Sequence, residues 1–298
     1  MDRDVDIVTN ALRALDPDGK RIAMVIRNTL DQLYDGQHTG RYRWDQLHKT
    51  EKTHCGTLIE INLQREMKFR DGLQMDFQIG GIEVDCKYSQ SLGGWMIPME
   101  AVGQICLLLW ADDERAEWSL GITRMDEQVL GRGANRDSKR TLSATGRESI
   151  RWVFHHAPLP PNILLQLPRQ QVDYIMSLTS GQKRIDEIFR VAQGRIIGRG
   201  VIATLGQQDD YMKRVRGNGG SRSRLSSEGI LILGHYDEHR RIAKELGLPI
   251  PELGELVSVR VVRSGRRGRQ TARIQNESWR IANPEDPIET APDCPHSV

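Results

Sequence analysis

The sequence predicts an α/β protein of two domains, and three observations lead to this prediction. The chain has 298 residues, more than the roughly 100–200 residues of a usual single domain. Helical periodicity alternates with strand-like apolar runs in the first half of the chain. A proline-rich stretch at residues 155–170 then interrupts both patterns. We therefore expect a first domain at residues 1–155, a linker at 156–170 and a second domain at 171–298.

The composition is that of a globular protein with a hydrophobic core. Hydrophobic residues make up 38% and charged residues 28% of the chain, and its net charge of +2 does not by itself indicate a nucleic-acid-binding protein. The four cysteines form no C-x-x-C pair, so neither a zinc site nor a disulfide framework is expected. The longest apolar run, residues 105–110, is far too short to span a membrane, and the N-terminus has no signal-peptide pattern. We expect a cytoplasmic protein.

Two helical segments are predicted at the start of the first domain. Apolar residues recur with helical spacing over residues 5–35, and Gly36 is expected to cap the end of that helix. Residues 53–67 form the second segment, in which Thr53 is the expected N-cap. Its apolar positions fall on one face at every fourth residue: Cys55, Ile59, Leu63 and Met67.

Four strands are predicted next. Residues 75–79 and 82–88 flank a Gly-Gly pair, which predicts a β-hairpin. Residues 102–110 and 118–122 are further strands, and the unbroken apolar run at 105–109 indicates burial on both faces. Helices before and after such strands indicate a layered α/β/α domain.

The second domain is predicted to begin with helix and to end with strands. Residues 185–205 have a strong helical pattern. Strands are predicted at residues 229–233, 256–262, 271–274 and 278–281. Residues 283–298 are rich in proline and acidic residues and are expected to form an edge or a tail.

Two carboxylates and a lysine lie in the predicted hairpin. Asp76 is in its first strand, and Asp85-Cys86-Lys87 is in its second. Because side chains alternate between the faces of a strand, Asp85 and Lys87 point to the same side. The hairpin can bring Asp76 alongside Asp85, where the two carboxylates repel unless a cation lies between them. Mg²⁺ is the natural occupant, because it prefers oxygen ligands and completes its shell with water and a substrate phosphate.

Lys87 would then lie beside both the metal and that phosphate. It could position and help to deprotonate an attacking water, or it could stabilise the charge that builds on the phosphate. Glu60, on the preceding predicted helix, is the candidate fourth member and could reach the same cleft. On its own, Asp-x-Lys in a strand is more often an ordinary salt bridge, so this interpretation depends on Asp76 and Glu60.

Several long segments resemble the NaeI-type restriction endonucleases. They are residues 29–37, 45–54, 56–63, 84–87 and 201–217, and the similarity covers nearly the whole chain. The resemblance implies a PD-(D/E)xK nuclease-type α/β/α core, followed by a second domain with a winged-helix motif related to the CAP fold. It implies that Glu60, Asp76, Asp85 and Lys87 occupy catalytic positions, and that the three acidic residues among them bind Mg²⁺. The Gly56-x-x-x-Glu60 pattern is also similar to the repair nuclease MutH, which shares this core.

The same resemblance implies how the protein acts on DNA. Members of the family are homodimers that bind two copies of a double-stranded DNA site, one of which is cleaved while the other activates the enzyme. The expected site is a GC-rich palindrome such as GCCGGC. The resemblance therefore predicts a type II restriction endonuclease whose second domain has an effector role.

Basic residues that could contact DNA occur in both domains. Arginine supplies bidentate hydrogen bonds to phosphate or guanine, and glycines let the backbone approach phosphate. The candidates in the second domain are Lys213, Arg214, Arg216, Arg222 and Arg224, together with Arg266, Arg267 and Arg269 at an expected hairpin tip. The candidates in the first domain are Lys49, Lys52, His54, Arg136, Lys139 and Arg140.

Two other functions compete with this interpretation. One is a DNA-binding regulator with a degenerate nuclease domain, and the intact set of four site residues argues against it. The other is a repair nickase of the MutH kind, and the second basic domain argues against that.

Overall fold

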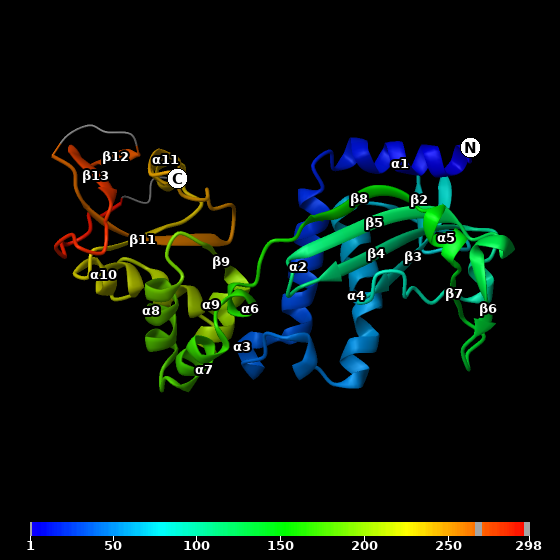
Figure 1. Ribbon diagram of the computed structural model, residues 1–298, viewed down its shortest axis with the longest axis horizontal. Coiled ribbons are helices and arrows are strands. Elements are labelled where there is room, and N and C mark those ends of the chain that lie inside the picture. Colours follow the sequence, from blue (N-terminus) through cyan, green and yellow to red (C-terminus); the bar gives the residue numbers. More distant parts are fainter. Residues whose placement is uncertain (1, 266–269, 295–298) are drawn as a thin grey trace. The chain divides into compact units, whose positions relative to one another are not determined.

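The computed structural model describes residues 2–265 and 270–294, and it divides into two compact units (Figure 1). The first unit consists of Met1–Leu33 and Leu47–Pro160, and the second consists of Tyr34–Gln46 and Pro161–Val298. Both units contain helices and a β-sheet, so the predicted α/β class is confirmed.

The unit boundaries differ from the expected domain boundaries at Tyr34–Gln46, which the sequence placed in the first domain. Tyr42 is only 5% exposed within the helical core of the second unit. Asn162 Nδ2 donates a hydrogen bond to the Tyr42 carbonyl oxygen at 3.1 Å, which ties the segment to that unit. The expected linker also contains regular structure, because β8 (Arg151–Pro158) and α7 (Arg169–Ser177) overlap its two ends.

A six-stranded sheet forms the centre of the first unit. Its strands follow the order β1-β2-β3-β4-β5-β8, and only the β3–β4 pair is parallel. Besides β8 they are β1 (Arg70–Asp71), β2 (Phe77–Ile79), β3 (Ile82–Ser89), β4 (Ile105–Asp112) and β5 (Glu117–Arg124). The predicted hairpin is confirmed by the antiparallel pairing of β2 with β3, and the strands predicted at 102–110 and 118–122 correspond to β4 and β5.

The helices of the first unit begin and end at residues that differ from those predicted. Residues 5–35 form two helices, α1 (Arg3–Leu15) and α2 (Lys20–Tyr34), rather than one. The break occurs because the Asp16 carboxylate accepts hydrogen bonds from the backbone N–H groups of Arg21 and Ile22, at 3.3 and 2.9 Å. At the end of α2, Asp35 and not Gly36 takes the left-handed conformation, with φ 48°.

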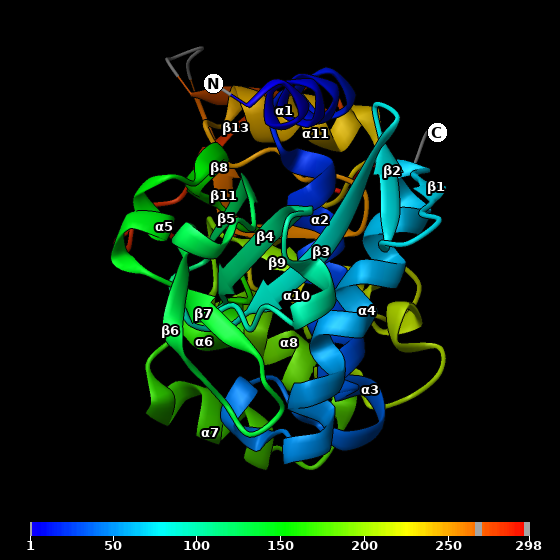
Figure 2. The ribbon, with the colours of Figure 1, turned by 90° about the vertical axis from the view of Figure 1, so that its right-hand side faces the viewer.

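The second predicted helix is α4 (Lys49–Met67), which lies beside β3 (Figure 2). It begins at His48, whose backbone N–H donates to Glu51 Oε2 at 2.8 Å. Thr53 therefore lies inside the helix and is not its N-cap, and its hydroxyl donates to the Lys49 carbonyl oxygen. The predicted apolar face is confirmed, since Cys55, Ile59, Leu63 and Met67 are all buried.

Strand β4 is buried on both faces, as its unbroken apolar sequence predicted. On one face Cys106, Leu108 and Trp110 pack into a cluster with Trp95 and Ile97, which lie in the β3–β4 connection. A two-stranded ribbon of β6 (Leu130–Ala134) and β7 (Arg140–Leu142) contributes to the same cluster and is followed by α5 (Ala144–Glu148). Figures 1 and 2 show this ribbon projecting from the sheet.

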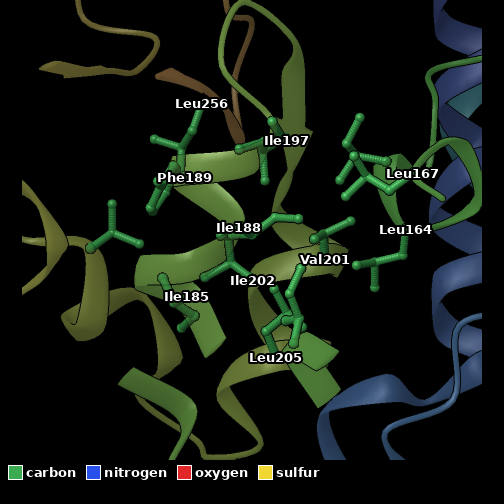
Figure 3. Packing of buried hydrophobic residues seen from close by; sticks show 14 of the residues in the cluster. Leu164, Leu167, Ile185, Ile188, Phe189, Ile197, Val201, Ile202, Leu205 and Leu256 are labelled. Carbon is green, nitrogen blue, oxygen red and sulfur yellow. The ribbon is translucent and has the colours of Figure 1, made fainter. Parts of the chain in front are cut away.

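Short helices build one core of the second unit. They are α6 (Ile163–Gln166), α7, α8 (Gly181–Val191), α9 (Arg199–Gly206) and α10 (Ser221–Ser226), and α3 (Gly36–Thr39) lies against α9. Figure 3 shows Ile185 and Ile188 of α8 facing Ile202 and Leu205 of α9. The single helix predicted at 185–205 is wrong, because Gly194 (φ 73°) and β9 (Ile196–Gly198) separate α8 from α9.

The strands of the second unit form a five-stranded sheet around β11 (Glu255–Arg263), which pairs with three others. These partners are β9, β10 (Ile230–Leu233) and β13 (Glu277–Ile281), and β12 (Thr271–Ile274) pairs with β13. All four predicted strands are confirmed, whereas α11 (Asp237–Glu245) was not predicted. The expected hairpin between β11 and β12 is wrong, because β13 lies between these strands in the sheet.

Among the described residues, no helix combines the length and apolar character that crossing a membrane requires.

Candidate active site

The structure brings Asp76, Asp85 and Lys87 together at the open end of the β2–β3 hairpin. Asp76 directly precedes β2, and Asp85 and Lys87 belong to β3. The Asp76 carboxylate accepts a hydrogen bond from the backbone N–H of Cys86 at 2.7 Å. Asp76 therefore lies next to the strand that carries the other two residues, as the predicted hairpin requires.

Asp85 and Lys87 form a close ion pair with little access to solvent. Lys87 Nζ donates to Asp85 Oδ1 at 2.7 Å, and the two side chains are 23% and 8% exposed respectively. Lys87 Nζ also donates to the Cys86 carbonyl oxygen at 3.1 Å. The shared direction of the two side chains, predicted from strand alternation, is confirmed.

The neighbouring parallel strand supplies a further contact. Asp85 lies opposite Cys106 of β4, and the Cys106 thiol approaches Asp85 Oδ2 at 3.4 Å. Burial, followed by the charge of Asp85 and its contact with the thiol, raises the pKa of Cys106, so this thiol stays protonated and can donate to the carboxylate. Sequence reasoning missed Cys106, because a cysteine within an apolar strand has no pattern of its own.

Burial and mutual repulsion shape the electrostatics of the acidic residues. Burial, then the charges of Asp76 and Asp85, raise the pKa of Glu60 against the lowering effect of Lys87. Burial raises the pKa of Asp85 as well, although Lys87 opposes this by charge and hydrogen bond. The charges of Asp76, Lys87 and Asp85 therefore all act on the Glu60 carboxylate of α4.

The carboxylates of this site suit a hard cation such as Mg²⁺, but they do not by themselves form a complete set of metal ligands. Carboxylates whose pKa values are raised by burial and by each other gain most from a neighbouring cation. Within the described ranges, however, no three acidic, histidine or cysteine side chains are gathered closely enough to form a complete ligand set. Mg²⁺ needs only one or two carboxylates, because waters and phosphate supply its other ligands. Asp76 and Asp85 could provide these two.

The candidate DNA-contacting residues of the first unit lie on α4 and on the ribbon. Lys49, Lys52 and His54 are in the first two turns of α4, where Lys49 and His54 are exposed and Lys52 is half-buried. This is the same helix that carries Glu60.

The ribbon residues are not equivalent. Arg136 and Lys139 are exposed between β6 and β7. Arg140 is half-buried, and its guanidinium donates to Glu127 Oε2 at 2.7 Å and to the Gly131 carbonyl oxygen at 2.8 Å. Arg140 therefore stabilises the ribbon through its own hydrogen bonds, whereas the exposed side chains of Arg136 and Lys139 could contact DNA.

The basic cluster of the second unit surrounds η4 (Tyr211–Val215) and α10 and is largely at the surface. Lys213, Arg214, Arg216 and Arg224 are exposed. Lys213 pairs with Asp210, Arg214 donates to Gln208 and Arg224 Nε donates to the buried Asp186 at 2.7 Å. The salt bridge between the exposed side chains of Lys213 and Asp210 is weak, so Lys213 could exchange its partner for phosphate. Arg224 instead pairs with a carboxylate that is only 2% exposed, and moving Arg224 away would leave that buried charge unpaired.

Arg222 differs from its neighbours. It is half-buried and donates to the Ile232 carbonyl oxygen at 3.1 Å, and burial lowers its pKa. It lines a cavity of about 380 Å³ together with residues of β10 and of the segment 291–294. Arg266, Arg267 and Arg269 lie outside the described residues.

Comparison with known proteins agrees with the resemblance seen in the sequence. The family model described as restriction endonuclease NaeI matches residues 6–290. The chain therefore belongs to the NaeI family of type II restriction endonucleases. The type II restriction enzyme NaeI of Lentzea aerocolonigenes is 52% identical to this chain over 302 residues, covering 99% of this chain and 95% of that enzyme.

Proposed function

We propose that this protein is a Mg²⁺-dependent type II restriction endonuclease that hydrolyses phosphodiester bonds in double-stranded DNA. Glu60, Asp76, Asp85 and Lys87 form its active site, and Asp76 and Asp85 hold the metal. The observation that carries the proposal is the ion pair of the half-buried Lys87 with the buried Asp85, beside Asp76 at the end of the β2–β3 hairpin. A solvated surface salt bridge would not explain this burial or the raised pKa of Glu60 nearby.

The state of Lys87 favours one of its two possible roles. Burial alone would lower the pKa of Lys87, but the charge and hydrogen bond of Asp85 outweigh it and raise that pKa. The ammonium group therefore keeps its proton near neutral pH, which suits stabilisation of charge on the phosphate and orientation of the attacking water. When bound, Mg²⁺ would supply Lewis acidity and lower the pKa of a coordinated water.

The second unit is proposed to be a winged-helix DNA-binding domain. Its elements α8, β9, α9, α10, β10 and β11 occur in the helix–strand–helix–helix–strand–strand order of that fold, with η4 inserted between α9 and α10 and α11 inserted between β10 and β11. The pairing of β11 with both β9 and β10 also supports the assignment. In this arrangement α10, next to the cluster of exposed basic residues, is the helix that would meet DNA.

We further propose a homodimer that binds two copies of a GC-rich palindrome similar to GCCGGC. The first unit would cleave one copy, and the second unit would bind the other as an activator. The proposal is supported by family membership and by basic residues at the surface of both units.

Digestion of plasmid DNA tests the proposed activity. We expect discrete double-stranded fragments with Mg²⁺ and binding without cleavage with Ca²⁺, since Ca²⁺ occupies carboxylate sites with a looser geometry. Binding without cleavage in both ions would support a regulator instead, and nicking of a single strand would support a MutH-like enzyme. A short duplex that carries the site should accelerate cutting of a single-site plasmid, and no acceleration would contradict the effector role alone.

A further inference from the structure

The turn between β1 and β2, which leads directly into Asp76, is organised by the carboxylate of Glu83. Three successive backbone N–H groups donate to it: Leu73 at 3.0 Å, Gln74 at 3.1 Å and Met75 at 3.0 Å. The side-chain amide of Gln78 donates a fourth hydrogen bond at 2.7 Å. One carboxylate therefore accepts from the three successive backbone donors that directly precede Asp76.

Successive N–H groups that converge in this way form a concave site for an anion. Here the anion is a side chain of the protein itself. The Glu83 carboxylate therefore takes the place of a bound anion in this turn.

The turn is packed tightly around the Glu83 carboxylate. A Cβ atom on Gly72 would lie 2.0 Å from the Met75 carbonyl oxygen and 2.9 Å from Glu83 Oε2. The Gly72 N–H group closes the turn by donating to the Asp76 carbonyl oxygen at 3.4 Å. Glycine at position 72 thus lets the turn wrap around the carboxylate and end at Asp76.

Asp76 is held from its other side by β3. Its carboxylate accepts from the Cys86 N–H, and Glu83 and Asp85 belong to the same strand, two residues apart. Strand β3 therefore carries the proposed metal ligand Asp85 and also Glu83, whose carboxylate fixes the backbone that leads into the second ligand, Asp76. If the turn relaxed, the spacing between the Asp76 and Asp85 carboxylates would change, although neither residue had been altered.

We infer that Glu83 is a positioning residue that sets the separation of the Asp76 and Asp85 carboxylates for metal binding. The inference rests on the proposed function and deepens it, because it adds a residue outside the set of four. Sequence reasoning missed Glu83, although its position, two residues before Asp85 on the same face of the strand, was available as a signal.

The variant Glu83→Gln tests this role, because it keeps the size of the side chain and removes the charge that holds the three N–H groups. Replacing groups that orient metal ligands typically weakens metal affinity by about 10–100-fold. We expect the Mg²⁺ concentration for half-maximal plasmid cleavage to rise by that factor, with a smaller change in the rate at saturating Mg²⁺. Binding of Mn²⁺ to the protein without DNA, measured by electron paramagnetic resonance, should weaken in parallel.

Glu114→Gln is the matched control, since Glu114 is an exposed glutamate of the same unit in the β4–β5 turn. It should leave both the Mg²⁺ dependence and the Mn²⁺ affinity unchanged. Unchanged Mg²⁺ dependence in Glu83→Gln, while the wild-type protein cuts, would overturn this inference and leave the proposed function intact. Failure of the wild-type protein to cut with any divalent ion would instead remove the proposed function.

A second variant covers the case in which Glu83→Gln does not fold. Gln78→Met removes one of the four donors to Glu83 and leaves the turn itself unchanged. A smaller rise in the Mg²⁺ requirement, with an unchanged melting temperature, would support the positioning role. Suppose that Glu83→Gln is unfolded and that Gln78→Met needs no more Mg²⁺ than the wild-type protein. This result would show that the Glu83 carboxylate only stabilises the turn, and it would overturn the inference.

Discussion

Replacing Lys87 by alanine is expected to reduce the rate of DNA cleavage by about 10²–10³-fold, the range typical of losing one group that stabilises charge in the transition state. The ammonium group is the only cation within hydrogen-bond distance of Asp85 in the described structure. Its loss removes the charge that would stabilise the phosphate and leaves a buried carboxylate without its ion pair. Cleavage of a plasmid in excess Mg²⁺, followed over time, measures the effect.

DNA binding by the Lys87→Ala variant should change little, because contacts between many basic residues and phosphates dominate affinity. A gel-shift titration in Ca²⁺ checks this point. Lys20→Ala is the control, since the side chain of Lys20 is 80% exposed and pairs with Asp18 at the surface. Cleavage by Lys87→Ala at the wild-type rate, or equal loss of binding and cleavage, would contradict the proposed role.

Replacing Asp113 by alanine is expected to destabilise the first unit by about 3 kcal/mol, as breaking a buried ion pair does. Arg27 of α2 and Asp113 of the β4–β5 turn pair through the two terminal guanidinium nitrogens, and their side chains are 7% and 6% exposed. Arg27 also pairs with Asp31 at 2.7 Å, and burial raises the pKa of Asp31 despite this partner. Without Asp113, the buried guanidinium of Arg27 has only Asp31 to offset the free energy cost of removing its charge from water.

Differential scanning calorimetry measures this loss, which corresponds to a fall of about 6–12 °C in the melting temperature for a domain of this size. Asp112→Ala is the matched control. Asp112 is the neighbouring residue, and its 3.6 Å pair with the exposed Arg115 is a surface interaction worth about 1 kcal/mol or less. Equal melting temperatures for the two variants would show that the buried pair does not stabilise the first unit.

The parts of the fold that were predictable are those whose pattern is local. The alternation of side chains around Gly80-Gly81 predicted the β2–β3 hairpin, and the four-residue spacing from Cys55 to Met67 predicted the buried face of α4. Asp85 and Lys87 could be placed on one side for the same reason, since a strand alternates its side chains.

The errors arose where a distant residue or a single hydrogen bond decided the outcome. Thr53 resembles an N-cap, but the Glu51 carboxylate accepts a hydrogen bond from the His48 N–H, and His48, five residues earlier, is the N-cap of α4. Tyr34–Gln46 follows a helix of the first unit, yet Tyr42 is buried in the core of the second. Periodicity cannot reveal which core an irregular segment joins.

The candidate site shows the same division. Asp76, Asp85 and Lys87 share a hairpin and were predictable together. Glu60 was named as a candidate fourth member from its place on the preceding helix, and the resemblance to a family added support. Cys106 came to the site through the parallel pairing of β3 with β4. Such parallel pairing depends on the path of the segment that connects the two strands, so it cannot be predicted from the sequence of either strand.

The location of the bound metal tests the central claim most directly. Crystals of the protein soaked in Mn²⁺, measured at a wavelength where manganese scatters anomalously, would reveal each bound ion as a peak. We predict a peak coordinated by carboxylate oxygens of Asp76 and Asp85, next to Lys87, that disappears in Asp85→Ala. A peak at other residues, with none at Asp76 and Asp85, would show that the cleavage site lies elsewhere in the protein.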